Sequence, residues 1–324
     1  MTLQQLRIVQ ETVRRNFNLT EVANALFTSQ SGVSKHLIDL EEELGVQIFE
    51  RRGKRLLGLT PPGRELIPIV ERTLLDIGNI RRLADNFAQR DEGTLRIATT
   101  HTQARYALPP IIAQFRRAWP RVDLLLHQGT PAEIAAMLLA DEADIGIATE
   151  ALADEEDLQC RPFYEWRHAV VVPRGHPLTS LPQLSLRDLA KYPLVTYHAG
   201  VTGRRRIDEA FAAAGLSPQV ALAALDSDVL KAYVELGLGV GLIAPTAFNP
   251  IVDSSLVLLP AAHLFASNTT LVAVRRRRLL RAFASDFVQR CCPEVRSGGP
   301  PYSQASSPLA RPRIQPPDRA AAIG

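Results

Sequence analysis

Side chains that can hydrogen-bond to the edges of DNA bases open a predicted helix near the N-terminus. The spacing of apolar residues predicts this helix over residues 30–44, with Val33 and Leu37 on its inward face. Its outer face starts with polar side chains, and the first turns of a recognition helix are the part that reaches base edges in the major groove. Glutamine suits adenine, whereas serine and lysine reach bases or phosphates. The candidate residues are Gln30, Ser31, Ser34 and Lys35.

A cationic turn follows the predicted helix. Two short apolar runs at 46–49 and 56–59 flank a basic segment that contains Gly53, and this pattern is typical of a β-hairpin. Positive charges on such a turn can lie along a phosphate backbone and make binding depend on salt. A basic turn that is only solvated explains this cluster equally well when it is taken alone. The candidate cations are Arg51, Arg52, Lys54 and Arg55.

The far end of the predicted helix is acidic, because residues 41–43 are consecutive glutamates. Carboxylates would repel the phosphates of a duplex. We therefore expect this end of the helix to point away from bound DNA.

Two shorter helices must hold the recognition helix in place. Apolar spacing predicts one near residues 3–13 and another at 20–27, followed by a polar break at 28–31. Three short helices alone would also fit a generic helical bundle. Three helices followed by a basic hairpin favour a winged helix-turn-helix DNA-binding domain over residues 1–60.

A long amphipathic linker helix is predicted over residues 61–90. Thr60 can cap its start, and Pro61 and Pro62 fit its first turn. Its apolar stripe is too wide to remain in water, and a second copy of the chain is the simplest partner. A homo-oligomer of this kind would present two DNA-binding domains to a palindromic site in double-stranded DNA.

The remainder of the chain has the alternating pattern of an α/β fold. Short apolar runs, typical of buried strands, alternate with amphipathic stretches between residue 93 and about residue 290. Helices are expected at 103–118, 202–214 and 276–290.

This region is expected to form an effector-binding domain, residues 93–292, with two α/β lobes. Lobe I would comprise residues 93–161 and 267–292, and lobe II residues 162–266, which gives two crossovers and a ligand cleft between the lobes. Residues 293–324 are rich in Pro, Ser, Gly and Arg and cannot bury a core, so a disordered tail is expected there.

Hydroxyl groups occur at the ends of several predicted strands and at helix starts. Exposed N–H groups at a helix start, together with threonine hydroxyls, can hold an anion without a cation. Each threonine alone is better explained as an ordinary helix cap, so an anion site requires that several of them meet in one cleft. The candidates are Thr100 and Thr102 in a strand-to-helix turn, Gln103 at the helix start, Thr149 at a strand end and Thr202 at another helix start.

Composition narrows the function classes. The net charge of +3 is too small to indicate nucleic acid by itself, so any basic footprint must be local. Three cysteines without metal-ligand spacing predict neither a metal site nor a cofactor. There is no signal peptide and no apolar run of about 18 to 20 residues, so we expect a cytoplasmic protein without a membrane partner. An enzyme or a secreted solute-binding protein is the alternative, but no catalytic motif supports the first.

Within the first 65 residues, three segments resemble the signature of LysR-type transcriptional regulators. By this resemblance, Gln30, Ser34 and Lys35 would read DNA, and the four hairpin cations would lie on phosphates. The segments are Ala23-x4-Thr28-Ser29-Gln30-Ser31-x2-Ser34, Leu40-Glu41-x2-Leu44-Gly45-x2-Ile48-Phe49-x-Arg51 and Leu59-Thr60-x2-Gly63.

LysR-type sensor domains are similar to periplasmic binding proteins, and here the run at 99–106 and the pattern Tyr164-x-Trp166 resemble the CysB-like branch. That branch controls sulfur assimilation genes in response to sulfate-like anions, O-acetylserine or N-acetylserine. The resemblance implies an activator that contacts RNA polymerase and assembles as a dimer of dimers. It does not separate cysteine biosynthesis from sulfonate utilisation, and another pathway with a different small anion is the alternative. The implied effector contacts are Thr100, Thr102, Gln103, Thr149 and Thr202, with Trp166 near the cleft.

Overall fold

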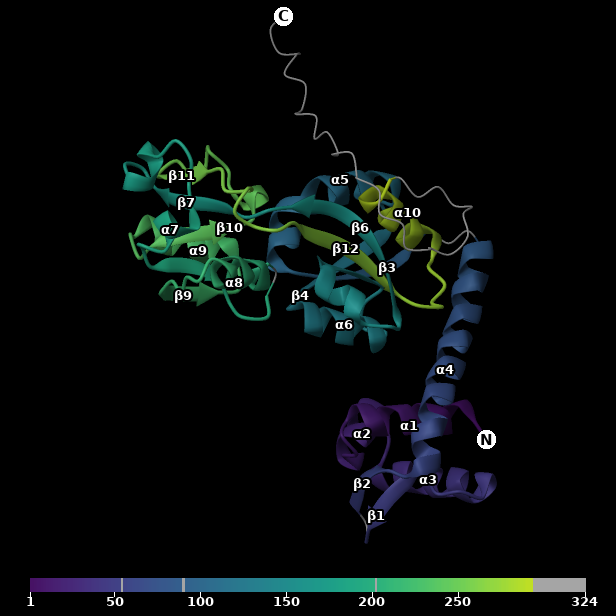
Figure 1. The fold of residues 1–324 in the computed structure, drawn as a ribbon. Helices are drawn as coiled ribbons and strands as arrows, with labels where there is room; N and C mark the ends of the chain where they lie inside the picture. Colours follow the sequence, from purple (N-terminus) through teal and green to yellow (C-terminus); the bar gives the residue numbers. More distant parts are fainter. Residues whose placement is uncertain (54, 89–90, 202, 294–324) are drawn as a thin grey trace, which may run out of the picture. The chain divides into compact units, whose positions relative to one another are not determined.

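The structure, a computed structural model of the 324-residue chain, describes residues 1–53, 55–88, 91–201 and 203–293 (Figure 1). Lys54, Thr202 and all but the first residue of the expected disordered tail lie outside the described residues. The chain forms two compact units. One comprises the chain up to residue 90 together with residues 277–281, and the other comprises residues 91–276 and the chain from residue 282 onward.

Three helices, a β-hairpin and a long helix make up the N-terminal unit. In chain order they are α1 (Leu3–Arg14), α2 (Leu19–Ala25), α3 (Gln30–Leu44), β1 (Phe49–Arg52), β2 (Arg55–Leu59) and α4 (Pro61–Phe87). Short polar side chains cap the helices by accepting N–H groups of the first turn. The caps are Thr2, Asn18, Ser29 and Thr60. This order is the predicted winged helix-turn-helix followed by a linker helix.

The core of this unit fixes the orientation of α3. Val33, Leu37 and Leu40 are fully buried and pack in one cluster with Ile8 of α1. The helix ends at Gly45, whose left-handed backbone, with φ of 68°, terminates the hydrogen-bond ladder. Since the apolar face is held in the core, the opposite face of α3 is turned to solvent.

The apolar stripe of α4 is only partly buried. Ile67 and Val70, in its first half, join the core of the N-terminal unit. Ile80, Leu83 and Phe87, in its second half, are 67%, 48% and 82% exposed. A single copy of the chain therefore leaves a row of large apolar side chains uncovered along α4.

Lobe I of the C-terminal unit is built on a five-stranded sheet. Its strand order is β4 (Val122–Gln128), β3 (Gly93–Thr99), β5 (Ile145–Thr149), β12 (Asn268–Arg275) and β6 (Leu158–Trp166). β3 pairs in parallel with β4 and β5, whereas β12 is antiparallel to β5 and β6. The helices of this lobe are α5 (Pro109–Ala118), α6 (Pro131–Leu139) and α10 (Ala282–Cys291).

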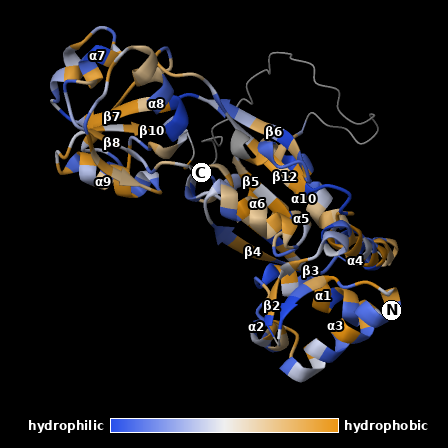
Figure 2. Cartoon of the chain, turned by 60° about the horizontal axis from the view of Figure 1, so that its bottom comes forward, coloured by the Kyte–Doolittle hydropathy of each residue, from blue (hydrophilic) through white to orange (hydrophobic). Residues whose placement is uncertain are grey.

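Lobe II has a second five-stranded sheet. The order is β11 (Leu256–Leu259), β7 (Ala169–Pro173), β10 (Val240–Ile243), β8 (Leu194–Tyr197) and β9 (Val220–Ala224). Its helices are α7 (Leu186–Leu189), α8 (Arg204–Ala213) and α9 (Ser227–Glu235). The strands β7 and β10 are strongly hydrophobic in Figure 2, and residues 170–172 are fully buried. The chain crosses from lobe I to lobe II after β6 and returns before β12, so there are two crossovers, as predicted.

Two helix predictions are wrong in detail. The helix expected at 103–118 is a π-helical turn, η1 (Gln103–Ala107), followed by α5, because Pro109 and Pro110 cannot donate to a continuous ladder. The helix expected at 276–290 begins only at Ala282. Before it, Arg277 has a positive φ of 64°, and Leu279 donates its N–H to Asn79 Oδ1 of α4 at 2.8 Å.

Candidate nucleic-acid interface and ligand site

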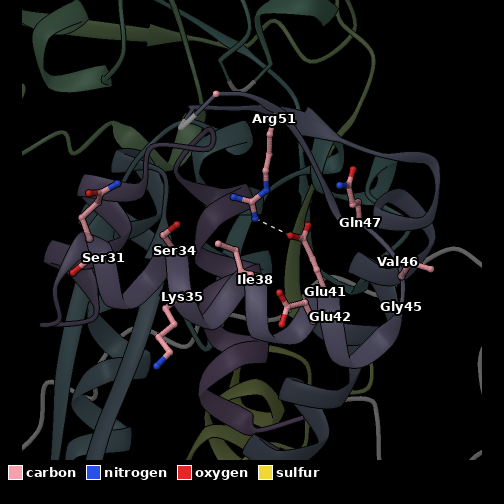
Figure 3. Close-up of a pocket in the computed structure, with 12 residues that line it drawn as sticks. Ser31, Ser34, Lys35, Ile38, Glu41, Glu42, Gly45, Val46, Gln47 and Arg51 are labelled. Carbon is pink, nitrogen blue, oxygen red and sulfur yellow. Dashed lines mark hydrogen bonds and ion pairs between the residues drawn. The ribbon is translucent and has the colours of Figure 1, made fainter.

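A hollow of about 850 Å³ lies along the outer face of α3 in the N-terminal unit (Figure 3). Helix α3 supplies one side of it, and the β-hairpin and the loop before it supply the other. The lining residues are Gln30, Ser31, Ser34, Lys35, Ile38, Glu41, Glu42, Gly45, Val46, Gln47, Arg51 and Gly53. The structure thus brings the four polar candidates of α3 together with one hairpin cation.

The start of α3 offers its polar groups to solvent. Gln30, Ser31 and Lys35 are exposed, and Ser34 is half-buried. The Ser29 hydroxyl caps the helix by accepting the Gly32 N–H at 3.1 Å, which fixes where these side chains leave the backbone. Such a row of exposed amide, hydroxyl and ammonium groups can donate to base edges and phosphate oxygens.

Glu41 has a role that the sequence did not reveal. Its carboxylate is buried and accepts the backbone N–H groups of Ile48 at 2.8 Å and Phe49 at 3.0 Å. The same carboxylate lies 2.7 Å from Nη2 of Arg51. The dashed line in Figure 3 marks this ion pair. Glu41 therefore ties the start of the hairpin to α3, and Arg51 is held by a carboxylate as well as facing the hollow.

The other hairpin cations and glutamates lie at the surface. Arg52 and Arg55 are exposed and face each other across the hairpin. Glu42 lines the hollow, and Glu43 pairs with the N-terminal amine of Met1. The three consecutive glutamates thus have three different environments, which their sequence alone could not indicate.

The predicted anion-binding residues of the C-terminal unit are buried. Thr100, Thr102, Gln103, Thr149 and Trp166 are each at most 7% exposed. The first three follow β3 directly, Thr149 ends β5 and Trp166 ends β6. Buried polar side chains of this kind require hydrogen-bond partners.

A row of side chains across three strands joins part of this set. Thr270 of β12 is opposite Thr149 of β5 and Tyr164 of β6. The Tyr164 hydroxyl donates to Gln103 Oε1 at 2.6 Å, and Trp166 Nε1 donates to Thr270 Oγ1 at 3.2 Å. Sequence reasoning missed Tyr164 and Thr270 as members of this cluster. The spacing of Tyr164 and Trp166 could have indicated the first, since residues two apart on a strand share a face.

The hydroxyls of Thr100 and Thr102 lie in different surroundings. Thr100 Oγ1 is buried and has no hydrogen-bond partner among the described residues. Thr102 is 3% exposed and lies beside Tyr197 of β8, whose hydroxyl is 2.7 Å from Ser227 Oγ. Thr102 therefore lies against lobe II, whereas the Thr100 hydroxyl contacts no hydrogen-bonding group of the described residues.

The groups around Trp166 are uncharged near neutral pH. The ring of His168 lies 4.9 Å from the ring of Trp166, and burial lowers the pKa of His168 to about 3. Burial raises the pKa of Tyr164 above its ordinary value, so its hydroxyl remains protonated. Hydroxyl, amide and neutral imidazole N–H groups are therefore the donors that this cluster can offer to an anion.

Gly203 lets the start of α8 approach this ring pair. Its φ is 77°, and a Cβ at this position would lie 2.6 Å from Nε2 of His168 and 2.9 Å from Cη2 of Trp166. Only glycine avoids both the backbone strain and the contact. The residue before it, the predicted effector contact Thr202, is outside the described part of the chain.

The structure describes residues 1–53, 55–88, 91–201 and 203–293. No group of three or more His, Cys, Asp or Glu side chains in these ranges could hold a metal ion. Over the same ranges, no helix combines the length and the apolar character needed to span a membrane.

Comparison with known proteins identifies the family. Residues 3–64 match the model of bacterial regulatory helix-turn-helix proteins of the lysR family, and residues 88–294 match the LysR substrate binding domain. The chain is 54% identical over 295 residues to the HTH-type transcriptional regulator SsuR of Burkholderia cenocepacia, covering 91% of this chain and 96% of that one. It is 52% identical over 291 residues to the HTH-type transcriptional regulator cbl of Escherichia coli K12, covering 90% and 92%.

A solved structure agrees with these relatives. The cofactor-binding domain of the Cbl transcriptional regulator is 47% identical to this chain, with a TM-score of 0.62, over 63% of this chain and 90% of that domain. The predicted fold class is confirmed, and the relatives are named as regulators rather than enzymes. LysR regulators bind promoter DNA and a small-molecule effector, and they form oligomers. The chain belongs to the LysR family of DNA-binding transcriptional regulators.

Proposed function

We propose that this regulator activates genes of sulfur assimilation, either for cysteine biosynthesis or for sulfonate utilisation, in response to a small effector. The effector is a sulfate-like anion, O-acetylserine or N-acetylserine. The proposal is supported by the similarity to regulators named SsuR, CysB and cbl over about nine tenths of the chain. The alternative is a LysR-type regulator of another pathway with a different small anion.

DNA recognition is assigned to α3 and the hairpin. The single observation that carries this proposal is that Gln30, Ser34 and Lys35 line one surface hollow with Arg51. A major groove admits a helix, and the first turns of α3 can then contact base edges. Exposed cations of the hairpin would lie on phosphates. The full proposed set is Gln30, Ser31, Ser34, Lys35, Arg51, Arg52, Lys54 and Arg55.

Effector binding is assigned to the buried cluster after β3 and around Trp166. The Thr100 hydroxyl is an unsatisfied buried donor, and an anion oxygen would satisfy it. Neutral donors can hold a small anion without a cation when several converge on it. The full proposed set is Thr100, Thr102, Gln103, Thr149, Trp166 and Thr202. The effector would favour one arrangement of the two lobes and so one spacing of the DNA-binding units.

Assembly is assigned to α4. Ile80, Leu83 and Phe87 leave an apolar row in water that a second copy of the chain would cover. A dimer of dimers in the cytoplasm would place pairs of α3 helices on promoter DNA and bring the protein to RNA polymerase. Leu83→Asp is expected to lower the mass measured by light scattering. Val252→Asp, at a 71% exposed position of lobe II, is the control and leaves the mass unchanged.

A thermal-shift panel with sulfate, thiosulfate, O-acetylserine, N-acetylserine and adenylyl sulfate tests the effector class. A ligand above its Kd must raise Tm by mass action, and the rise must be smaller in Thr100→Ala. Footprinting on a sulfur-gene promoter with and without the stabilising compound then tests regulation. If no compound raises Tm and the footprint never changes, the sulfur proposal is wrong. DNA binding that responds to none of these compounds would then favour the alternative, a LysR-type regulator of another pathway.

A further inference from the structure

Tyr106 joins the two lobes of the C-terminal unit. It belongs to η1 of lobe I, yet its ring packs against the apolar core of lobe II, which includes Val171, Leu230 and Ala247. A large side chain of one lobe therefore forms part of the core of the other.

The hydroxyl of Tyr106 lies within a charged group of lobe II. It donates to the carboxylate of Asp228 and accepts a hydrogen bond from Lys231 Nζ at 3.3 Å. The Lys231 ammonium also lies over the Tyr106 ring, 5.4 Å from its centroid. The neighbouring Arg105 adds an ion pair across the lobes, with Nε 3.5 Å from Asp228 Oδ2.

Contacts within lobe II hold the Lys231 side chain of this charged group in place. Lys231 is 8% exposed at its side chain, donates to the Ala247 carbonyl at 2.8 Å and pairs with the buried Asp253 carboxylate at 3.0 Å. A buried ammonium that is bonded to the Ala247 carbonyl and paired with both Asp253 and Asp228 cannot turn away without leaving charge unpaired. Lys231 is thus held in place as a hydrogen-bond donor to the Tyr106 hydroxyl.

Tyr106 is protonated and Asp228 is ionised, as their hydrogen bond requires. Burial and the neighbouring Asp228 hold the pKa of Tyr106 well above its ordinary value, so the phenol remains a donor. Burial alone would raise the pKa of Asp228, but hydrogen bonds from Tyr106 and Lys231 lower it below its ordinary value. Asp228 therefore remains an acceptor.

The same short turn carries a residue of the proposed effector site. Gln103 and Tyr106 both lie in η1, a π-helical turn closed by the Leu108 N–H bond to the Gln103 carbonyl at 2.9 Å. π-Helical turns are frequent at functional sites. A ligand that shifts the backbone at Gln103 therefore also shifts the backbone that holds Tyr106.

We propose that Tyr106 is a positioning residue that couples the effector site to the spacing of the lobes, by inserting its ring and hydroxyl into the Lys231–Asp228 group of lobe II. The coupling rests on the proposed function, because Gln103 is an effector contact only there. The joined arrangement of the lobes is the one that binds the effector, and it is populated before the effector arrives.

The experiment measures the distance between the lobes in the full-length protein. Spin labels are attached through p-acetylphenylalanine at positions 114 of α5 and 212 of α8, both exposed, so the three native cysteines are left untouched. Tyr106→Phe keeps the ring and removes only the two hydroxyl hydrogen bonds. Tyr233→Phe, on the surface of α9, is the matched control.

We expect one narrow distance distribution in the wild type and in Tyr233→Phe, and a second, longer population in Tyr106→Phe. Hydrogen bonds to charged groups change such an equilibrium about tenfold or more. Adding sulfate to Tyr106→Phe should restore the narrow distribution. The apparent Kd for sulfate should equal the intrinsic Kd divided by the fraction of molecules whose lobes are joined. A role limited to core packing would leave the ligand-free distribution of Tyr106→Phe unchanged, because phenylalanine keeps the ring.

A Tyr106→Phe distribution identical to that of the wild type overturns the proposal, whatever sulfate does. If the second population appears but saturating sulfate bound by the wild type does not remove it, the coupling to the effector site is also overturned. If the wild type fails to bind sulfate, sulfate is excluded as the effector under the proposed function, and O-acetylserine and N-acetylserine remain. The ligand-free distributions still decide whether Tyr106 holds the lobes together.

Discussion

The Glu41 carboxylate and the Arg51 guanidinium lie 2.7 Å apart and tie the recognition helix to the β-hairpin beside it. Because Glu41 also accepts two backbone N–H groups at the start of the hairpin, a single buried side chain fixes the relative position of the two elements proposed to contact DNA. The geometry of the hollow along α3 therefore depends on an acidic residue that does not itself need to contact DNA.

Removing this anchor should destabilise the N-terminal unit. Glu41→Ala leaves two buried N–H groups unsatisfied and Arg51 without its partner, so the free energy of unfolding should fall by about 2 to 4 kcal/mol. Urea unfolding followed by circular dichroism measures this loss. Glu42→Ala, one position later and exposed, should change stability by less than about 0.5 kcal/mol. Equal effects of the two substitutions would contradict the anchoring role.

The salt dependence of DNA binding should separate the cations that contact phosphate. Lys35→Ala and Arg52→Ala each remove an exposed cation, and each should reduce the slope of log K against log salt by about 1. Arg51→Ala should reduce it less, because Glu41 already neutralises that charge. Fluorescence anisotropy with a promoter duplex gives these slopes. The salt concentration is varied between about 50 and 200 mM, the range over which phosphate contacts change the affinity strongly. Lys191→Ala, paired with Asp188 on the C-terminal unit, is the control and should leave the slope unchanged.

Gly203 should tolerate no side chain. Gly203→Ala combines left-handed backbone strain with a Cβ 2.6 Å from His168, so the free energy of unfolding of the C-terminal unit should fall by about 2 to 4 kcal/mol. Gly200→Ala has the same kind of backbone, with φ of 82°, but no atom within 4 Å of the new Cβ, and should cost about 1 to 2 kcal/mol.

Tryptophan fluorescence during urea unfolding reports this comparison, because both tryptophans of the chain, Trp119 and Trp166, lie in the C-terminal unit. A Gly203→Ala variant no less stable than Gly200→Ala would show that the ring pair has room for a methyl group.

His168 should make the C-terminal unit sensitive to acid. Its folded pKa of about 3 lies below the ordinary value of about 6.5, so the unfolded chain binds the extra proton between these values. The stability that neutral His168 contributes is complete above about pH 6.5 and is lost as the pH falls toward 3, by up to about 1.4 kcal/mol per unit. Urea unfolding at pH 5 and pH 7 should show this difference, and His168→Phe should reduce it.

The control for this pH dependence is His198→Phe, at an exposed position. Its stability difference between the two pH values should match that of the wild type. If His168→Phe retains the full wild-type difference, other groups cause the acid sensitivity.

The sequence by itself determined the local elements. Ser29 as a cap, Val33 and Leu37 on one face and Gly45 as a terminator specify α3, since these signals act within a few residues. The basic hairpin after α3 and the capped start of α4 follow from equally short patterns, and the structure has both. The first strand of the hairpin is displaced from the expected 46–49 to Phe49–Arg52, so Arg51 and Arg52 lie in the strand rather than in the turn. Their exposed polar residues were also predictable, because the apolar face must turn inward.

Only the tertiary structure decided which distant residues meet. Glu41 could not be told from Glu42 and Glu43 until the hairpin folded back on α3. Tyr106 meets Lys231, 125 residues away, and Tyr164 meets Gln103, 61 residues away, only after both crossovers are in place. Such contacts depend on how two sheets and their helices pack, and no short-range pattern of apolar and polar residues encodes that packing.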